Sequence, residues 1–135
     1  MIRQSHVGVI EVRVSAEADR LAMLRAVAET VLLTADFTLD VVTDVRVALD
    51  EVATALILDA IPGAELACEF RYDSGEVRVR VATVTETDSA LTEQSVGWHL
   101  LDALTDAIRT TCDGFDDELR GYPVAIHFSK VGNED

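Results

Sequence analysis

The sequence predicts a two-layer α/β sandwich, in which three helices cover one face of a mixed, mostly antiparallel sheet. Stretches with apolar residues at helical spacing are interspersed with runs in which every second residue is apolar. The paired runs in the middle of the chain carry charges at their alternate positions: Glu69, Arg71, Arg78 and Arg80. Such charges are typical of a sheet whose second face is open to water.

The first two elements are a strand and an amphipathic helix. Apolar residues nearly alternate in VGVIEVRVS, residues 7–15, with a slip or bulge expected near Ile10. Ser15 then stands where a helix N-cap is favoured, and Glu17 and Asp19 suit the first turn. Helical spacing follows as far as residue 35: Leu21, Leu24, Ala28, Val31, Leu32 and Ala35.

A second helix and a hairpin come next. After a short break at DFTLD, the helical spacing resumes and ends near Pro62 and Gly63. Its apolar stripe consists of Val41, Val45, Ala48, Leu49, Val52 and Leu56. Alternation over residues 66–72 and again over 77–81, on either side of the turn DSG, predicts the hairpin.

The last third of the chain predicts a loop, a helix and a strand. The polar stretch TETDSALTEQS, residues 85–95, is long for a loop in a compact domain. The following VGWHLLDALTDAIRTTC, residues 96–112, has one apolar stripe and is predicted as the third helix. In YPVAIHFSK apolar residues alternate again, and Pro123 confines this final strand to an early or edge position.

The composition is that of a single domain over residues 1–135. A chain of this length can bury one core without disulfides or metal, and 49% apolar residues argue against disorder. The net charge of −14, from 11 basic and 25 acidic residues, argues against nucleic acid or an anionic membrane as direct partner. Both need clustered Lys and Arg. A basic protein partner is compatible with this charge.

The two cysteines, Cys68 and Cys112, lie far apart without CxxC spacing or histidine companions. This fits a reducing compartment and no zinc site, and two buried thiols are expected. An exposed Cys112 would instead suit redox sensing. No start resembling a signal peptide and no apolar run of roughly 18 residues occurs, so we expect a cytoplasmic protein without membrane contact.

No pattern in the chain is typical of a metal centre or of a common catalytic site. The histidines His6, His99 and His127 fall in different elements, without acids or cysteines at ligand spacing. GxSxG, GxxxxGK[ST] and GxGxxG motifs are absent. Their absence argues against acyl transfer and against a phosphate cradle built on glycines.

The element order, together with VRVALDEVATALI in the second helix and SVGWHLLDALTD near the third, resembles the RsbW/SpoIIAB anti-sigma factors. These are ATP-binding serine kinases of the GHKL, or Bergerat, fold, and the actinobacterial RsbW type is the most similar. The resemblance extends from about Val7 to Phe128 and rests on element order and partial motifs rather than on one strong motif. It implies a Bergerat-type sandwich.

In this family the second helix carries a glutamate that acts as general base and, four residues later, an asparagine that holds Mg²⁺ at the nucleotide phosphates. Glu51 matches the glutamate, and Asp50 beside it is expected to be a solvated neighbour. Ala55 stands at the asparagine position. The two positions share a helix face, but alanine has no side-chain donor or acceptor.

Two further family boxes are incomplete. The DxGxG box contacts adenine, and Asp88 matches its aspartate, but Ser89, Ala90 and Leu91 replace its glycines. The GLGL-like turn under the phosphates is reduced to VGW, in which Gly97 alone is retained. These losses predict that the kinase has degenerated and binds no nucleotide.

Two other readings stay open. If the site still works, the chain is an active serine kinase that uses Mg-ATP and phosphorylates its antagonist, with Glu51 as base. A scaffold that binds only STAS-domain proteins is the second alternative.

The resemblance also implies partners. An arginine on the first helix of the family contacts the sigma factor, and Arg25 is its nearest match; otherwise Arg25 is a surface arginine whose stem covers apolar neighbours. We expect an anti-sigma factor that sequesters an alternative sigma factor of the stress-response or sporulation type. A STAS-domain anti-anti-sigma protein would release it, and the chain would be a homodimer. Its acidity would steer it toward basic surfaces of the sigma factor.

Overall fold

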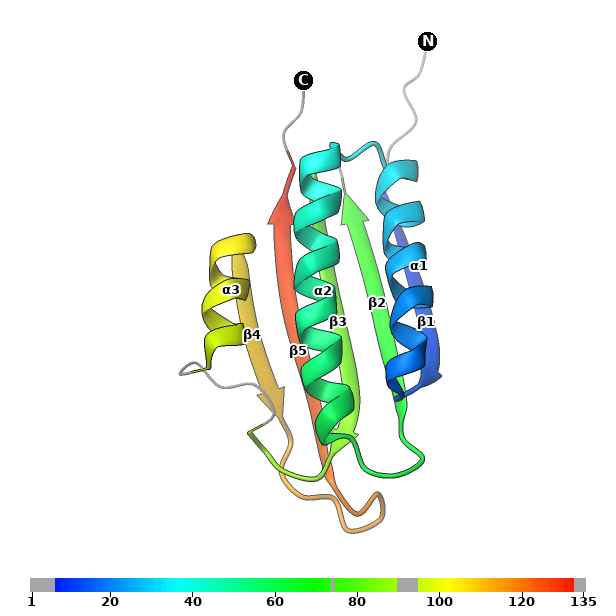
Figure 1. Ribbon diagram of the computed structural model, residues 1–135, viewed down its shortest axis with the longest axis vertical. Helices are drawn as coiled ribbons and strands as arrows, with labels where there is room; N and C mark the ends of the chain where they lie inside the picture. The colour runs from blue at the N-terminus through cyan, green and yellow to red at the C-terminus, as the bar shows by residue number, and fades with distance from the viewer. Residues whose placement is uncertain (1–6, 74, 90–94, 133–135) are drawn as a thin grey trace.

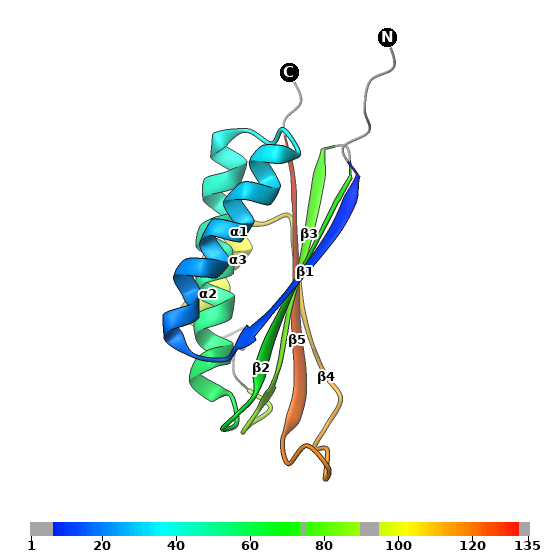
Figure 2. The ribbon, with the colours of Figure 1, turned by 90° about the vertical axis from the view of Figure 1, so that its right-hand side faces the viewer.

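The computed structural model describes residues 7–73, 75–89 and 95–132. Figure 1 shows the helices side by side in one layer over the sheet, and Figure 2 shows the two layers edge-on. The elements in chain order are β1 (Gly8–Ser15), a 3₁₀ turn (Ala18–Arg20), α1 (Leu21–Thr34), α2 (Leu39–Asp59), β2 (Glu65–Asp73), β3 (Glu76–Thr85), α3 (Val96–Leu104), β4 (Ala107–Cys112) and β5 (Tyr122–Val131).

The sheet has five strands in the order β1-β2-β3-β5-β4. All four strand pairs are antiparallel, so the predicted two-layer sandwich is confirmed, with a sheet that is antiparallel rather than mixed. β5 lies between β3 and β4, and Pro123 is its second residue, the early position that the sequence predicted.

The core lies between the helix layer and the sheet. The apolar stripes predicted for the first two helices are buried, apart from Leu21 at the start of α1, which is half-buried. The inward residues of the sheet are buried as well: Leu66, Cys68, Phe70, Val77, Val79, Val81, Val124, Ile126 and Phe128. α2 ends at Asp59, before Pro62, and Gly63 adopts a positive φ of 80° in the turn that leads to β2.

The prediction of a third helix over residues 96–112 is wrong in its second half. α3 ends at Leu104, and residues 107–112 form the edge strand β4. The amide and the hydroxyl of Thr105 both donate to the carbonyl of Leu101, at 3.0 and 2.7 Å, which closes the helix. The carboxylate of Asp106 then accepts from the amide of Val131 at 2.6 Å and aligns the chain with β5. Pairing with a distant strand therefore overrides the local helical pattern.

Two expectations for the N-terminal elements are also wrong. β1 pairs with β2 without interruption from Gly8 to Ser15, so there is no bulge near Ile10. Ser15 is the last residue of β1 rather than a helix N-cap, because the chain stays paired as far as Ala16, whose amide donates to Ala64 at 2.9 Å. The helix begins after a 3₁₀ turn, at Leu21.

The two cysteines occupy different environments. Cys68 is fully buried, as expected, and burial raises the pKa of its thiol to about 12. Cys112 is exposed, which corrects the expectation of two buried thiols. The reason is its position as the last residue of the edge strand β4, a strand that the sequence had assigned to a helix.

Candidate functional site

α2 lies between α1 and α3 in the helix layer and so has two edges (Figure 1). On the α1 side, two ion pairs join the helices: Arg25 Nε donates to Asp50 Oδ1, and Arg46 Nη1 donates to Glu29 Oε2, each at 2.8 Å. All four side chains are about two-fifths exposed, so the pairs border on solvent. Asp50 was predicted to be a solvated neighbour, and the structure instead gives it a partner on α1.

Glu51 and Ala55 lie on the other edge of α2, as their spacing predicted. Asp44, two turns before Glu51 on this edge, pairs with Lys130 of β5 at 3.1 Å. Glu51 is half-buried and makes no hydrogen bond or ion pair with the residues that the structure describes. The side chain of Ala55 packs against the core cluster. On this edge a ligand would meet the free carboxylate of Glu51 and, one turn further along the helix, only the methyl group of Ala55.

The loop that follows β3 is tied to the end of α2. The carboxylate of Asp59 accepts from the amide and the hydroxyl of Thr87, at 3.2 and 2.7 Å. The amide of Glu86 also donates to the carbonyl of Asp59, at 2.7 Å. Asp88 follows Thr87 in the chain, and it is exposed. The replaced glycine positions Ala90 and Leu91 lie outside the described residues.

α3 begins beside this loop. Its N-cap is Ser95, whose hydroxyl accepts from the amide of Trp98 at 3.1 Å, and Gly97 lies in the first turn. Trp98 packs against the core, whereas His99 is exposed. α3 contacts α2. The residues that match the nucleotide-site motifs therefore lie on the α3 side of α2, on α3 or on the loop before it. Arg25 is on the opposite edge.

The most exposed positions of α1 and α2 carry few charges, while the ion-paired Arg25, Glu29, Arg46 and Asp50, each about two-fifths exposed, lie between them. All six exposed residues of α1 are uncharged: Ala22, Met23, Ala26, Thr30, Leu33 and Thr34. Of the six exposed residues of α2, namely Leu39, Asp40, Thr43, Val47, Thr54 and Leu58, one is charged. We call these twelve residues the helix face. A chain with 27% charged residues would ordinarily place many of them here, and depletion of charge is characteristic of the centres of protein interfaces.

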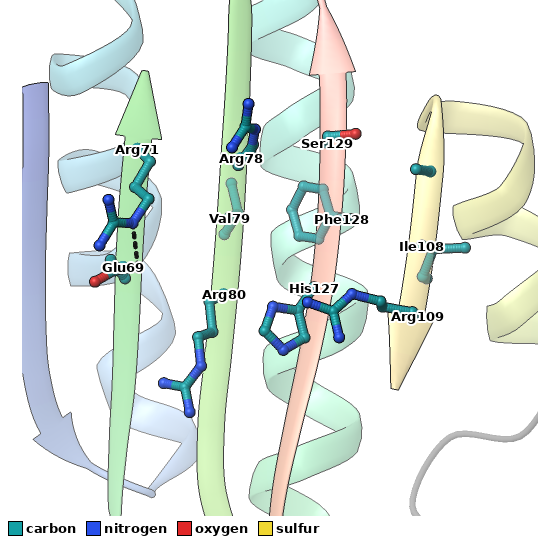
Figure 3. A pocket seen from close by; sticks show the side chains of 11 residues that line it. Glu69, Arg71, Arg78, Val79, Arg80, Ile108, Arg109, His127, Phe128 and Ser129 are labelled. Carbon is teal, nitrogen blue, oxygen red and sulfur yellow. Dashed lines mark hydrogen bonds and ion pairs between the residues drawn. The ribbon is translucent and has the colours of Figure 1, made fainter. Parts of the chain in front are cut away.

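The open face of the sheet carries a cavity of about 370 Å³ that the sequence analysis missed. Four apolar residues line it, namely Val79, Ala107, Ile108 and Phe128, together with seven charged or polar ones: Glu69, Arg71, Arg78, Arg80, Arg109, His127 and Ser129 (Figure 3). The outward positions of three of the arginines were visible in the alternation of β2 and β3. Arg109 was not, because its segment was predicted to be helical.

None of the helices in the described part of the chain has both the length and the apolarity that crossing a membrane requires. Within the same residues, no group of three or more His, Cys, Asp or Glu side chains is placed to hold a metal ion.

Comparison with known proteins supplies the remaining evidence. No protein-family model matches the chain. The chain is 34% identical over 124 residues to the anti-sigma-F factor RsbW of Mycobacterium tuberculosis, in strain CDC 1551 / Oshkosh and in strain ATCC 25618 / H37Rv. The match covers 92% of this chain and 74% of each relative. The matched region is therefore nearly the whole chain rather than one element or one surface.

Proposed function

Because the chain belongs to the RsbW family of anti-sigma factors, we propose that it sequesters an alternative sigma factor of the stress-response or sporulation type in the cytoplasm. The similarity to the anti-sigma-F factor over 92% of the chain is the observation that carries this proposal. The bound sigma factor would be held away from RNA polymerase and from promoter DNA.

The helix face is the surface that we assign to the sigma factor. Its large apolar residues are well exposed: Met23 is 53%, Leu33 is 49% and Leu58 is 81% accessible. Apolar surface of this kind gains most free energy when a partner protein covers it. The net charge of −14 would speed the encounter with basic parts of the sigma factor, while the helix face, in which Asp40 is the one charge, would form the contact.

Arg25 is the charged anchor in this proposal. It borders the helix face, and Asp50 fixes its guanidinium through Nε. An arginine that is positioned before binding loses less side-chain entropy in the complex than a free one. The ion pair with Asp50 therefore supports a role in binding, although it would also serve as a simple link between α1 and α2.

The nucleotide site is proposed to be degenerate. Catalysis of phosphoryl transfer depends on holding Mg²⁺ and the phosphates in place, and Ala55 cannot supply the metal ligand that the family asparagine provides. The free carboxylate of Glu51 is what favours the alternative, an active serine kinase. On our proposal Glu51 is a remnant of the site, and neither Asp88 nor Gly97 contacts a nucleotide.

Calorimetry with Mg-ATP separates these two alternatives. We expect the heat of Mg-ATP addition to be the same for Glu51→Ala as for the wild-type chain, and no phosphate to be transferred. Micromolar binding, together with transfer of phosphate to a STAS-domain protein that is lost in Glu51→Ala, would establish the kinase and refute the degenerate site.

The proposed partners include a STAS-domain antagonist, which would release the sigma factor by competing for the anti-sigma factor, and a second copy of the chain in a homodimer. With no phosphorylation by this chain, release would depend on partner levels, on another kinase or on redox state. Light scattering coupled to size exclusion should give twice the monomer mass of 14.7 kDa.

Co-purification from the native cell tests the function itself. A tagged chain should bring down a sigma factor, and the purified chain should inhibit transcription by the polymerase that contains it. Recovery of a STAS-domain protein without any sigma factor would show a scaffold and contradict the anti-sigma function.

A further inference from the structure

Four of the eleven basic residues of the chain converge on the cavity in the open sheet face. The strand register places them in two adjacent rows across the sheet. Arg80 of β3 lies between Glu69 of β2 and His127 of β5, and His127 is followed by Arg109 of β4. In the next row, Arg71 lies opposite Arg78 and Arg78 opposite Ser129. Figure 3 shows the side chains of both rows on the same side of the sheet.

This arrangement is costly for the sheet. Arg71 and Arg78 are directly opposite each other, and like charges in cross-strand pairs are destabilising. Each of them has a glutamate two residues before it on its own strand, at 3.0 Å from Arg71 and 3.3 Å from Arg78. Arg80 and Arg109 form no ion pair with any carboxylate of the described residues. Their guanidinium groups leave the cavity with an uncompensated positive charge.

We propose that this cavity binds a small anion that carries phosphate groups, such as a phosphorylated metabolite or a nucleoside phosphate. Arginine guanidinium groups present paired N–H donors that match phosphate oxygens, and Arg80 and Arg109 have theirs free on either side of His127. The hydroxyl of Ser129 adds a further donor at the wall.

The size and the surroundings of the cavity select a compact ligand. About 370 Å³ lies within the usual range for small-molecule sites. The whole chain has a net charge of −14, so the residues outside this cluster together carry a net negative charge. A long polyanion such as nucleic acid would reach beyond the cluster and be repelled by the acidic residues there. A small anion would stay within the cluster, and salt largely screens it from charges more than about 10 Å away.

The pKa of His127 should change when an anion occupies the cavity. Burial, Arg109 and Arg80 lower the pKa of His127, and Glu69 opposes them by raising it. Ser129, Arg78 and Arg71 are the other polar residues that line the cavity. A bound phosphate would offset the two arginines, so the pKa of His127 should rise on binding and a proton should be taken up. Binding should accordingly tighten as the pH falls from the pKa of the bound imidazole to that of the free imidazole, and should level off below it.

Calorimetry with inorganic pyrophosphate tests the site, at about 150 mM salt so that diffuse attraction is screened. We expect saturable binding at one site per chain. Arg80→Ala and Arg109→Ala should each weaken it about tenfold or more. Arg13→Ala is the matched control, because Arg13 lies on the same sheet face, is exposed and is paired with Glu11, yet does not line the cavity. It removes the same charge and should leave the affinity unchanged.

Two further measurements distinguish a specific binding site from nonspecific electrostatic attraction. Glu69→Gln removes the one acid that lines the cavity and should tighten binding of pyrophosphate. The pKa of His127, measured from the pH dependence of its imidazole NMR shifts, should rise as pyrophosphate is added. Equal weakening by Arg13→Ala and Arg80→Ala, or an unchanged pKa of His127 at saturation, would overturn the proposal. So would binding of acidic peptides but not of pyrophosphate. The proposal is independent of the sigma factor, whose binding Arg80→Ala should not alter.

Discussion

The helix face and the open face of the sheet are both exposed to solvent, yet their chemistry is opposite. The helix face has one charged residue among twelve. The cavity on the sheet face is lined by four arginines, although acids outnumber bases 25 to 11 in the chain. Neither composition follows from the fold, because outward positions contribute little to the core and tolerate most residues.

The two surfaces therefore suit different kinds of partner. Charged residues on the outside of a helix cost almost nothing and improve solubility, so their depletion from α1 indicates a surface that is covered by a partner. Arginines directly opposite each other in a sheet do cost stability, so the Arg71–Arg78 pair, beside the unpaired Arg80 and Arg109, favours an anion bound on this face. We therefore assign a protein partner to one face and a small anion to the other.

The largest effect should come from the core that both faces share. Leu56 of α2 is fully buried, and Leu56→Ala should lower the free energy of unfolding by about 2 to 5 kcal/mol through the cavity that it leaves. Denaturant unfolding measures the loss, and both binding activities should fall only in proportion to the unfolded fraction. Loss of one activity alone in a folded variant would show that Leu56 acts directly on that face.

An intermediate effect should distinguish the two ion pairs between α1 and α2. Arg25→Ala should weaken sigma-factor binding about tenfold, or roughly 1.4 kcal/mol, whereas Arg46→Ala should leave it unchanged. The pairs are matched, with the same 2.8 Å separation and nearly equal exposure. Both variants should lose less than about 1 kcal/mol of stability, because exposed pairs contribute little. Equal losses of affinity would mean that Arg25 only links the helices.

The smallest effect should appear on the sheet face. Arg78→Thr removes the like charge opposite Arg71 and adds a residue that suits strands, so the free energy of unfolding should rise by about 0.5 kcal/mol. The same variant should bind pyrophosphate more weakly. A destabilised Arg78→Thr chain would show that the arginine rows support the sheet rather than a ligand.

The sequence predicted those parts of the fold that depend on local pattern. The stripes of α1 and α2 and the β2–β3 hairpin needed only the spacing of apolar residues, and the structure confirms them. β4 could not be found in this way, because residues 107–112 become a strand only through pairing with β5, whose partner residues lie between 12 (Cys112 and Val124) and 22 (Ala107 and Ser129) positions further on. The missed strand also led to the wrong expectation for Cys112.

The same distinction holds for the candidate sites. Glu51 and Ala55 were placed on one helix face from their four-residue spacing alone, and the structure agrees. The meeting of Arg80, His127 and Arg109 depends on the register of three strands that are distant in sequence. Register of this kind has no local signature, so His127 could not be distinguished from an ordinary strand histidine.

We assign the sigma factor to the helix face and not to the sheet face, and a matched pair of substitutions distinguishes the two faces. Met23 on α1 and Val9 on β1 are both apolar and both 53% exposed, on opposite faces of the sandwich. The measurement is the affinity of Met23→Asp and Val9→Asp for the co-purified sigma factor. We expect Met23→Asp to weaken binding about a hundredfold and Val9→Asp to match the wild-type chain. A loss confined to Val9→Asp would contradict the assignment.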